Sequence, residues 1–139
     1  MPPKEIIGLD VGIAATGLAR ASTTARLPEP LMSLPTDKVV SKVRELMGKS
    51  GLEAIVVGLP RNLSGEDTAQ TKWVRDWVDK TKPRLPIPFF WQDEAITSRH
   101  AAKLQTSKFK NQKFDEHALA AAIILQDFLD TPENERVRC

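Results

Sequence analysis

The sequence predicts an α/β protein in which a single mixed sheet carries helices on its faces. Two observations support this class. The first two strand-like segments, residues 5–12 and 16–22, are separated by a short glycine-containing turn, as in an antiparallel hairpin. The later apolar segments, residues 52–60 and 86–94, each follow an amphipathic helical pattern, as parallel strands with helical crossovers do.

The elements after the hairpin are irregular at first. Residues 27–35 contain three prolines and therefore predict at most an irregular edge strand. Apolar residues recur at helical spacing from Val39 to Met47, with Asp37 as the expected cap and Gly48 or Gly51 as the expected stop.

The middle of the chain alternates buried strands with helices. Residues 52–60 form a nearly continuous apolar run rich in β-branched residues, which is typical of a central strand covered on both faces. Residues 67–82 predict an amphipathic helix in which Trp73 and Trp77 lie one turn apart. Residues 86–94 predict a third buried strand that finishes on two acids.

The last third of the chain predicts mainly helices. We expect a short helix over residues 97–105, a polar loop over 106–113, a final helix from about 115 to 130, and a short polar tail over 131–139. Residues 1–139 are expected to form one domain, because a chain of 139 residues is long enough for a single core.

The composition excludes several classes of protein. Hydrophobic residues make up 41% and charged residues 27%, and no apolar run approaches the roughly 20 residues of a membrane-spanning helix. The single cysteine, Cys139, cannot form an internal disulfide or a cysteine-based metal site. Since no signal-peptide pattern is present, we expect a cytoplasmic protein that does not enter membranes.

Three acids occupy positions where charge is costly. Asp10 lies inside the first strand, Glu94 ends the third buried strand, and Asp115 opens the last helix. If the first strand is central, these carboxylates converge on one edge of the sheet, and a divalent Mg²⁺ or Mn²⁺ ion is the usual partner for such a cluster. A site of this kind suits phosphodiester cleavage.

Each acid also has a simpler structural interpretation. Asp10 fits a turn residue that accepts hydrogen bonds from backbone amides, Glu94 fits a strand end in solvent, and Asp115 fits a helix cap. A catalytic site is therefore predicted only from the three acids taken together.

Four segments carry a resemblance to a known family. They are GLDVGIAATGLA, IVVGLPRNLSGEDTAQ, WQDEAITSRHAAKL and HALAAAIILQDFL, and their order and spacing span nearly the whole chain. The chain resembles the YqgF family, also called RuvX, whose members are described as Holliday-junction resolvases and as nucleases that mature the ends of pre-16S ribosomal RNA. The resemblance implies a ribonuclease-H-like fold, a mixed five-stranded sheet whose first three strands are antiparallel, with helices on both faces.

The resemblance assigns Asp10 and Glu94 as the first two catalytic acids, and it leaves the third position open. The spacing of the family pattern puts the third acid at His117, whereas Asp115 lies two residues earlier. Either Asp115 reaches the metal from the first helical turn, or His117 supplies a neutral imidazole nitrogen as a ligand or general base. A second departure is the pair Ala14 and Ala15, where family members often carry Lys-Arg.

Basic residues point to nucleic acid as the partner. No acid occurs between residues 96 and 113, a stretch that contains Arg99, Lys103, Lys108, Lys110 and Lys113. An enzyme that cleaves the phosphate backbone needs basic residues beside its acidic metal site, because they bind the neighbouring phosphates. Arg61 and Asn62 are further candidate nucleic-acid contacts, because they lie in a loop at the carboxyl end of a predicted strand.

Several functions remain open on the sequence. Sugar kinases and actin-like ATPases use a similar Asp-Gly hairpin, but they need two such domains, which 139 residues cannot supply. Three hypotheses remain: a nuclease for pre-16S ribosomal RNA ends, a resolvase of branched DNA, and a catalytically weak module that binds nucleic acid or the transcription machinery. A resolvase needs a homodimer to cut two strands symmetrically, whereas trimming of RNA ends is possible for a monomer.

Overall fold

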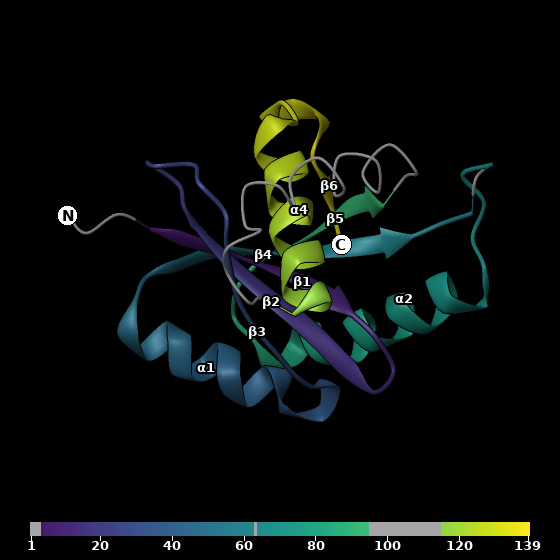
Figure 1. Cartoon of the computed structure of the whole chain (residues 1–139), viewed down its shortest axis with the longest axis horizontal. Helices are drawn as coiled ribbons and strands as arrows, with labels where there is room; N and C mark the ends of the chain where they lie inside the picture. The colour runs from purple at the N-terminus through teal and green to yellow at the C-terminus, as the bar shows by residue number, and fades with distance from the viewer. Residues whose placement is uncertain (1–3, 63, 95–114) are drawn as a thin grey trace.

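In the computed structural model, residues 4–62, 64–94 and 115–139 are described. They form one six-stranded sheet in the order β3-β2-β1-β4-β5-β6, with helices on both faces (Figure 1). The strands are β1 (Glu5–Val11), β2 (Ala15–Ser22), β3 (Glu29–Pro35), β4 (Leu52–Pro60), β5 (Phe89–Glu94) and β6 (Val137–Arg138). The mixed α/β prediction is confirmed.

The first three strands form an antiparallel meander, as expected. β1 pairs with β2 from Glu5↔Ser22 to Val11↔Thr16, and β2 pairs with β3 on its other side. β3 is the edge strand, and the register shifts between Leu18 and Ala19 of β2 where the proline-rich segment pairs with it. An edge strand tolerates proline because its outer side has no neighbouring strand to which a backbone N–H would donate.

The strands that follow run parallel to β1. β4 pairs with β1, with Leu9 opposite Val57, and β5 pairs with β4 from Ile55↔Phe89 to Pro60↔Glu94. Every residue of β4 from Ala54 to Leu59 is buried. The carboxyl ends of β1, β4 and β5 therefore meet at one edge of the sheet, where the acids are expected.

Each face of the sheet has its own core cluster. The helices α1 (Val39–Lys49) and α2 (Ala69–Thr81) cover one face, where Val43 and Val74 pack against Leu9 and Val57. The helix α4 (Glu116–Asp130) crosses the other face (Figure 1), where Leu125 belongs to the cluster of Ile6 and Val56.

The predicted start of α1 was wrong, whereas Gly51, one of the two expected stops, directly follows the cap residue Ser50 at the end of the helix. Asp37 lies in a 3₁₀ turn, Thr36–Lys38, and the cap residue of α1 is Lys38, which makes no side-chain capping bond. The helix continues through Gly48 to Lys49. The 3₁₀ turn gives the Val39 N–H a partner, the carbonyl of Thr36, so the chain enters the helix without a capping side chain.

α4 lies unusually close to the sheet because glycines face it. A Cβ atom built on Gly8 of β1 would lie 2.5 Å from Leu125 Cγ, and one built on Gly17 of β2 would lie 1.9 Å from the carbonyl oxygen of His117. Only glycine permits such contact between helix and strand backbones. The amino end of α4 therefore rests directly on β2.

The carboxyl-terminal segment corrects two predictions. The sheet has six strands rather than five, and residues 131–139, expected as a polar tail, contain a 3₁₀ turn (Glu133–Glu135) and strand β6. Val137 pairs with Trp91 and the Cys139 N–H donates to the carbonyl of Phe89, so this segment satisfies part of the outer edge of β5. A strand of two residues carries no readable period, which is why its sequence looks like a tail.

Within the described ranges, no helix is long and apolar enough to span a membrane. The helix expected over 97–105 and the loop expected over 106–113 lie outside these ranges. The final helix was predicted from about Asp115 to Asp130, and α4 confirms it, with Asp115 as its cap residue.

Candidate active site at the carboxyl edge of the sheet

Asp10 lies one residue before the end of β1, and its Cα pairs with that of Gly17. Alternate residues of a strand face opposite sides of the sheet. Ile6 and Gly8 both meet α4, so Asp10 projects toward the same helix. Its side chain is 23% exposed, which leaves one approach from solvent.

His117, in the first turn of α4, faces Asp10. Its Nδ1 lies 3.5 Å from Asp10 Oδ2, and its side chain is 53% exposed. This separation exceeds that of a good N–H···O hydrogen bond, so the two groups face each other without satisfying one another. A carboxylate and an imidazole placed in this way can share a cation or a water molecule.

Gly17 allows this pairing, because it sits opposite Asp10 in β2 and beneath the backbone of His117. Gly17 was not predicted as a functional position. A signal was available: glycine inside a strand often marks a close backbone approach. The identity of the approaching residue is set by the tertiary structure alone.

The turn after Asp10 is locked by two buried threonines that the sequence analysis also missed. The Thr36 hydroxyl donates to the carbonyl of Gly12 over 2.6 Å and lies 2.8 Å from the Thr16 hydroxyl. The Thr36 N–H donates to the carbonyl of Ala14. These bonds fix the turn that follows Asp10, which contains Ala14.

Asp115 serves as the cap of α4. Its Oδ1 accepts hydrogen bonds from the backbone N–H of His117 over 2.7 Å and of Ala118 over 3.3 Å. Desolvation raises the pKa of the Asp115 carboxyl, but hydrogen bonds from His117, Ser33 and Ala118 outweigh it and hold the pKa below its usual value. The Asp115 side chain thus orients the helical turn that contains His117.

We expect Asp115→Ala to lower the free energy of unfolding by about 1 kcal/mol at neutral pH, because the first turn of α4 loses its cap. The lowered pKa gives this contribution a pH dependence. It is complete above the ordinary aspartate pKa of 3.8 and is lost as the pH falls through the lower value of the folded state. Urea unfolding of Asp115→Ala and of the unaltered protein should be measured from pH 6 to about pH 2. We expect the difference between their free energies of unfolding to become smaller as the pH falls. A difference that is constant with pH would contradict this.

Glu94 is the last residue of β5, and its Cα pairs with Pro60 at the end of β4. β4 separates β5 from β1, so Glu94 and Asp10 belong to the same edge with one strand between them. In the parts of the chain that the structure describes, no group of three or more His, Cys, Asp or Glu side chains is arranged to hold a metal ion.

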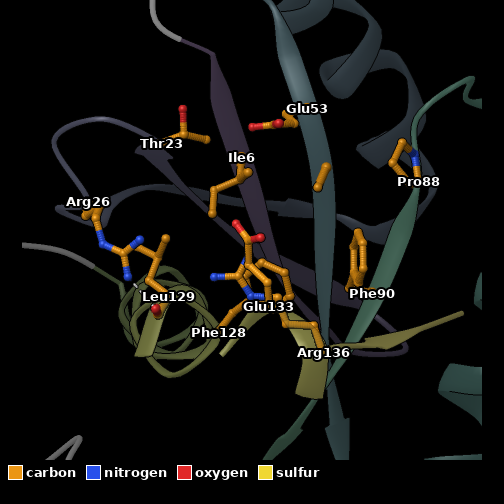
Figure 2. Close-up of a pocket in the computed structure, with 11 residues that line it drawn as sticks. Ile6, Thr23, Arg26, Glu53, Pro88, Phe90, Phe128, Leu129, Glu133 and Arg136 are labelled. Atoms are coloured by element: carbon orange, nitrogen blue, oxygen red, sulfur yellow. Dashed lines mark hydrogen bonds between the residues drawn. The ribbon is translucent and has the colours of Figure 1, made fainter. Parts of the chain in front are cut away.

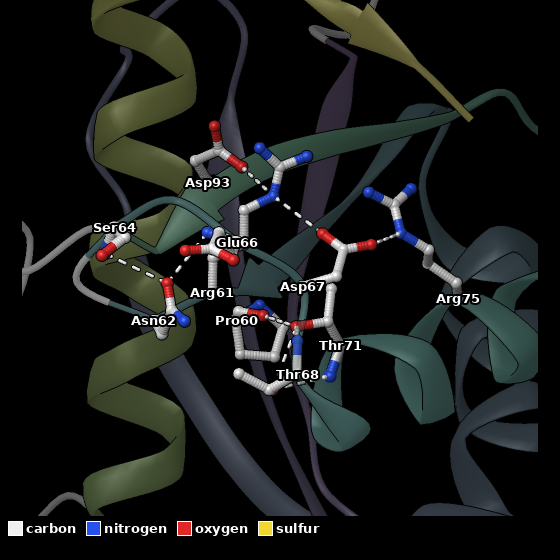
Figure 3. Close-up of polar contacts among 10 residues, drawn as sticks. All are labelled: Pro60, Arg61, Asn62, Ser64, Glu66, Asp67, Thr68, Thr71, Arg75 and Asp93. Atoms are coloured by element: carbon white, nitrogen blue, oxygen red, sulfur yellow. Dashed lines mark hydrogen bonds and ion pairs between the residues drawn. The ribbon is translucent and has the colours of Figure 1, made fainter.

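The loop after β4 contains the two other predicted site residues that the structure describes. Asn62 Oδ1 accepts from the backbone N–H of Ser64 over 3.0 Å and of Glu66 over 2.9 Å, so this side chain closes the loop (Figure 3). Arg61 Nε lies 3.4 Å from Asp67 Oδ1 and 3.5 Å from Asp93 Oδ1. Arg61 therefore joins the loop to the end of β5.

The remaining predicted contacts to nucleic acid lie outside the described residues; they are Arg99, Lys103, Lys108, Lys110 and Lys113. The structure thus brings Asp10 and His117 together, places Asp115 as the cap of the same helix, and positions the Glu94 backbone at the same edge.

A cavity of about 330 Å³ lies at the other end of the sheet, near the amino ends of the parallel strands (Figure 2). Its lining includes Ile6 at the start of β1 and Pro88 just before β5, together with Arg26 and Arg136. Asp10 and His117 are not among the described residues of this lining. The candidate catalytic groups therefore belong to the opposite, carboxyl edge.

Comparisons with known proteins identify the family of this chain. Residues 4–131 match the RuvX family, described as Holliday junction resolvase. A protein of Roseiflexus sp. (strain RS-1), named "Putative pre-16S rRNA nuclease", is 34% identical over 93% of this chain and 96% of its own length. One with the same name from Sulfurihydrogenibium sp. (strain YO3AOP1) is 36% identical over 90% of this chain and 89% of its own length.

The solved structures establish the relationship of fold. Thermus thermophilus RuvC in complex with a Holliday junction substrate superposes with a TM-score of 0.64 over 98% of this chain and 99% of RuvC, at 13% identity. A second structure of Thermus thermophilus RuvC gives a TM-score of 0.59 at 14% identity. At this identity the likeness concerns the fold, which is ribonuclease-H-like as expected.

Proposed function

This chain belongs to the RuvX family, and from that membership we propose that it is a divalent-metal-dependent nuclease that processes the ends of pre-16S ribosomal RNA. The observation that carries the proposal is the pairing of Asp10 with His117, 3.5 Å apart at the carboxyl edge of the sheet. A nuclease of this type hydrolyses phosphodiester bonds in structured nucleic acid.

The donor set at this edge fits Mg²⁺ or Mn²⁺. Carboxylate oxygens are the ligands that these ions prefer, and the Asp10 carboxylate is partly exposed on a rigid strand. We assign Asp10 and Glu94 as the residues that hold the ion, supported by the meeting of β1 and β5 at one edge. A bound ion would lower the pKa of a coordinated water and neutralise charge on the scissile phosphate.

His117 is our choice for the third position, with Asp115 in a supporting role. His117 Nδ1 faces Asp10, whereas Asp115 Oδ1 is engaged with the backbone of α4. A neutral imidazole at this place can accept a proton from an attacking water or bind the ion directly. Asp115 then acts by holding the helical turn that aims the imidazole.

We expect His117→Ala to reduce cleavage by about 100-fold to 10,000-fold, the usual range for loss of an acid–base group. Asp115→Ala should reduce cleavage much less, because it removes a cap rather than a reacting group. Initial rates on a labelled pre-16S ribosomal RNA fragment with Mg²⁺ or Mn²⁺ measure both variants. The reverse ranking would assign the third position to Asp115.

Resolution of branched DNA is the second candidate function, favoured by the description of the matching family as Holliday junction resolvase. Symmetric cutting of two strands requires a homodimer, whereas an RNA-trimming nuclease can act as a monomer. Cleavage of the RNA fragment and of a four-way DNA junction, paired with the mass of the protein in solution, separates the two. Binding of both substrates without cleavage would instead identify a binding module.

A further inference from the structure

We propose that a cleft beside the carboxyl end of β5 binds a phosphate group of the nucleic-acid strand through Arg61 and Arg75. The proposal rests on the nuclease function above and adds a site on the face of the sheet opposite to Asp10 and His117. The cleft has a volume of about 420 Å³, within the range of ligand sites, and its lining includes both arginines, Trp91, Asp93 and Val137.

A single carboxylate holds both guanidinium groups. Arg61 Nε lies 3.4 Å from Asp67 Oδ1, and Arg75 Nε donates to Asp67 Oδ2 over 3.1 Å (Figure 3). Asp67 thus lies between the Nε atoms of the two side chains. Its position is fixed in turn by the backbone bridge between Arg61 and Asp67 that closes the loop.

The terminal nitrogens of both arginines are turned away from this carboxylate. Figure 3 shows the two guanidinium groups side by side, with Asp67 at their Nε atoms and their terminal nitrogens directed away from it. Toward the residues that the structure describes, Arg75 makes its side-chain hydrogen bond through Nε alone, and Arg61 makes its closest ion pairs through Nε. Among the described residues, each guanidinium therefore retains donors for a further acceptor.

Trp91 limits the freedom of Arg75. The Arg75 Cζ atom lies 5.5 Å from the centroid of the indole ring, in cation–π contact. Asp67 thus binds the Nε atom of Arg75, and Trp91 contacts the face of its guanidinium group. A guanidinium held in this way loses little conformational freedom when it binds an anion, so more of the interaction energy remains for affinity.

The chemistry of two such groups selects a phosphate. Guanidinium forks match phosphate oxygens in a bidentate geometry that a lysine ammonium cannot reproduce. Asp67 and Asp93 balance the formal charge of the two arginines, and Glu135 balances Arg136 in the same lining, so the cleft holds its ligand by directed hydrogen bonds rather than by a large positive field. We therefore expect weak binding with the salt dependence of a single phosphate contact.

The position of the cleft connects it to the proposed catalytic edge. Arg61 follows Pro60, the Cα partner of Glu94, and Asp93 immediately precedes Glu94 in β5. Trp91 packs against the core cluster of α1 and α2, whereas Asp10 points toward α4 on the other face of the sheet. We infer that the cleft holds a phosphate of the strand outside the catalytic centre, at the same end of the sheet.

The test is the affinity for a labelled single-stranded RNA of about ten nucleotides, measured by fluorescence anisotropy in EDTA at several salt concentrations. We expect Arg75→Gln to weaken binding about tenfold, the loss typical of a charge-assisted contact. The slope of log K against log salt should decrease in magnitude by about 0.7, the value for one phosphate contact on a single strand.

Two further variants keep the result interpretable. Arg44→Gln removes one positive charge from α1, where Arg44 donates to the carbonyl of Arg84, and should bind RNA like the unaltered protein. Arg75→Lys keeps the charge but loses the fork, so it should bind with intermediate affinity. If Arg75→Gln is unstable by thermal melting, the test is the RNA affinity of Arg75→Lys relative to that of the unaltered protein.

Equal affinities and salt slopes for the Arg75 and Arg44 variants would overturn the proposal. Binding of a mononucleotide as tight as that of the RNA would overturn the assignment to a strand. The proposed nuclease function is tested separately, by hydrolysis of a small activated phosphodiester with Mn²⁺. If the unaltered protein binds RNA through Arg75 but hydrolyses no phosphodiester, the proposed cleft is supported and the proposed nuclease function is refuted.

Discussion

Replacing Asp10 with asparagine is expected to reduce metal-dependent cleavage by about a thousandfold or more while leaving the protein folded. The substitution keeps the size of the side chain and removes the charge that is proposed to hold the ion. β1 aims this carboxylate more accurately than a loop would, and phosphoryl chemistry tolerates little misplacement. The measurement is the initial rate on the RNA fragment with saturating Mn²⁺.

The stability of the same variant distinguishes catalysis from a structural role. In chelator at pH 8, we expect Asp10→Asn to melt at the same temperature as the unaltered protein or slightly higher, because carboxylate repulsion at the edge is relieved. A structural aspartate holding backbone amides would instead lose about 1 kcal/mol or more on this change. Asp76→Asn, on the exposed side of α2, controls for loss of one negative charge. A clear drop in melting temperature for Asp10→Asn alone would contradict the catalytic assignment.

Replacing Gly17 with alanine is the second change expected to have a large effect. The new Cβ would lie 1.9 Å from the carbonyl oxygen and 2.1 Å from the carbonyl carbon of His117, both backbone atoms that cannot rotate away. The first turn of α4 must therefore move off the sheet. We expect a loss of about 2–3 kcal/mol of stability from overpacking and at least about a 100-fold loss of cleavage from misplacement of His117.

A matched glycine in the same protein provides the control. Gly48 lies inside α1, and a Cβ atom built on it meets nothing within 4 Å. Gly48→Ala should stabilise the protein by about 0.5–1 kcal/mol, since alanine is the better helix former, and should not alter cleavage. Urea unfolding and cleavage rates of the two variants test the pair. A Gly17→Ala protein with normal activity would show that the close approach of α4 is unnecessary.

Much of the architecture could be predicted because it has a local signal. The continuous apolar run from Leu52 to Leu59 indicates a strand covered on both faces, and the structure buries all of it except its first two residues. The start of the last helix at Asp115 was readable because a capping aspartate before an apolar stretch is a local feature. The charge of Asp10 was informative for the same reason, since an apolar strand gives no local cause for it.

The parts that could not be predicted depend on contacts between distant residues. The amino-acid pattern offers both Asp115 and His117, and only the packing of α4 on Gly17 turns the imidazole toward Asp10. Likewise, Arg61 reads as a free basic residue in a loop, and only the folded structure brings Asp67 and Asp93 to its Nε.

Local patterns were enough to predict the strands and helices from β1 to β5, the position of Asp10 in β1 and the cap of α4, because period and capping depend on neighbours within a few residues. Tertiary structure alone decided the sixth strand, the orientation of the arginines around Asp67, and the 3.5 Å approach of His117 to Asp10. These features depend on register between strands and on the missing Cβ of Gly17, and neither leaves a periodic trace in the chain.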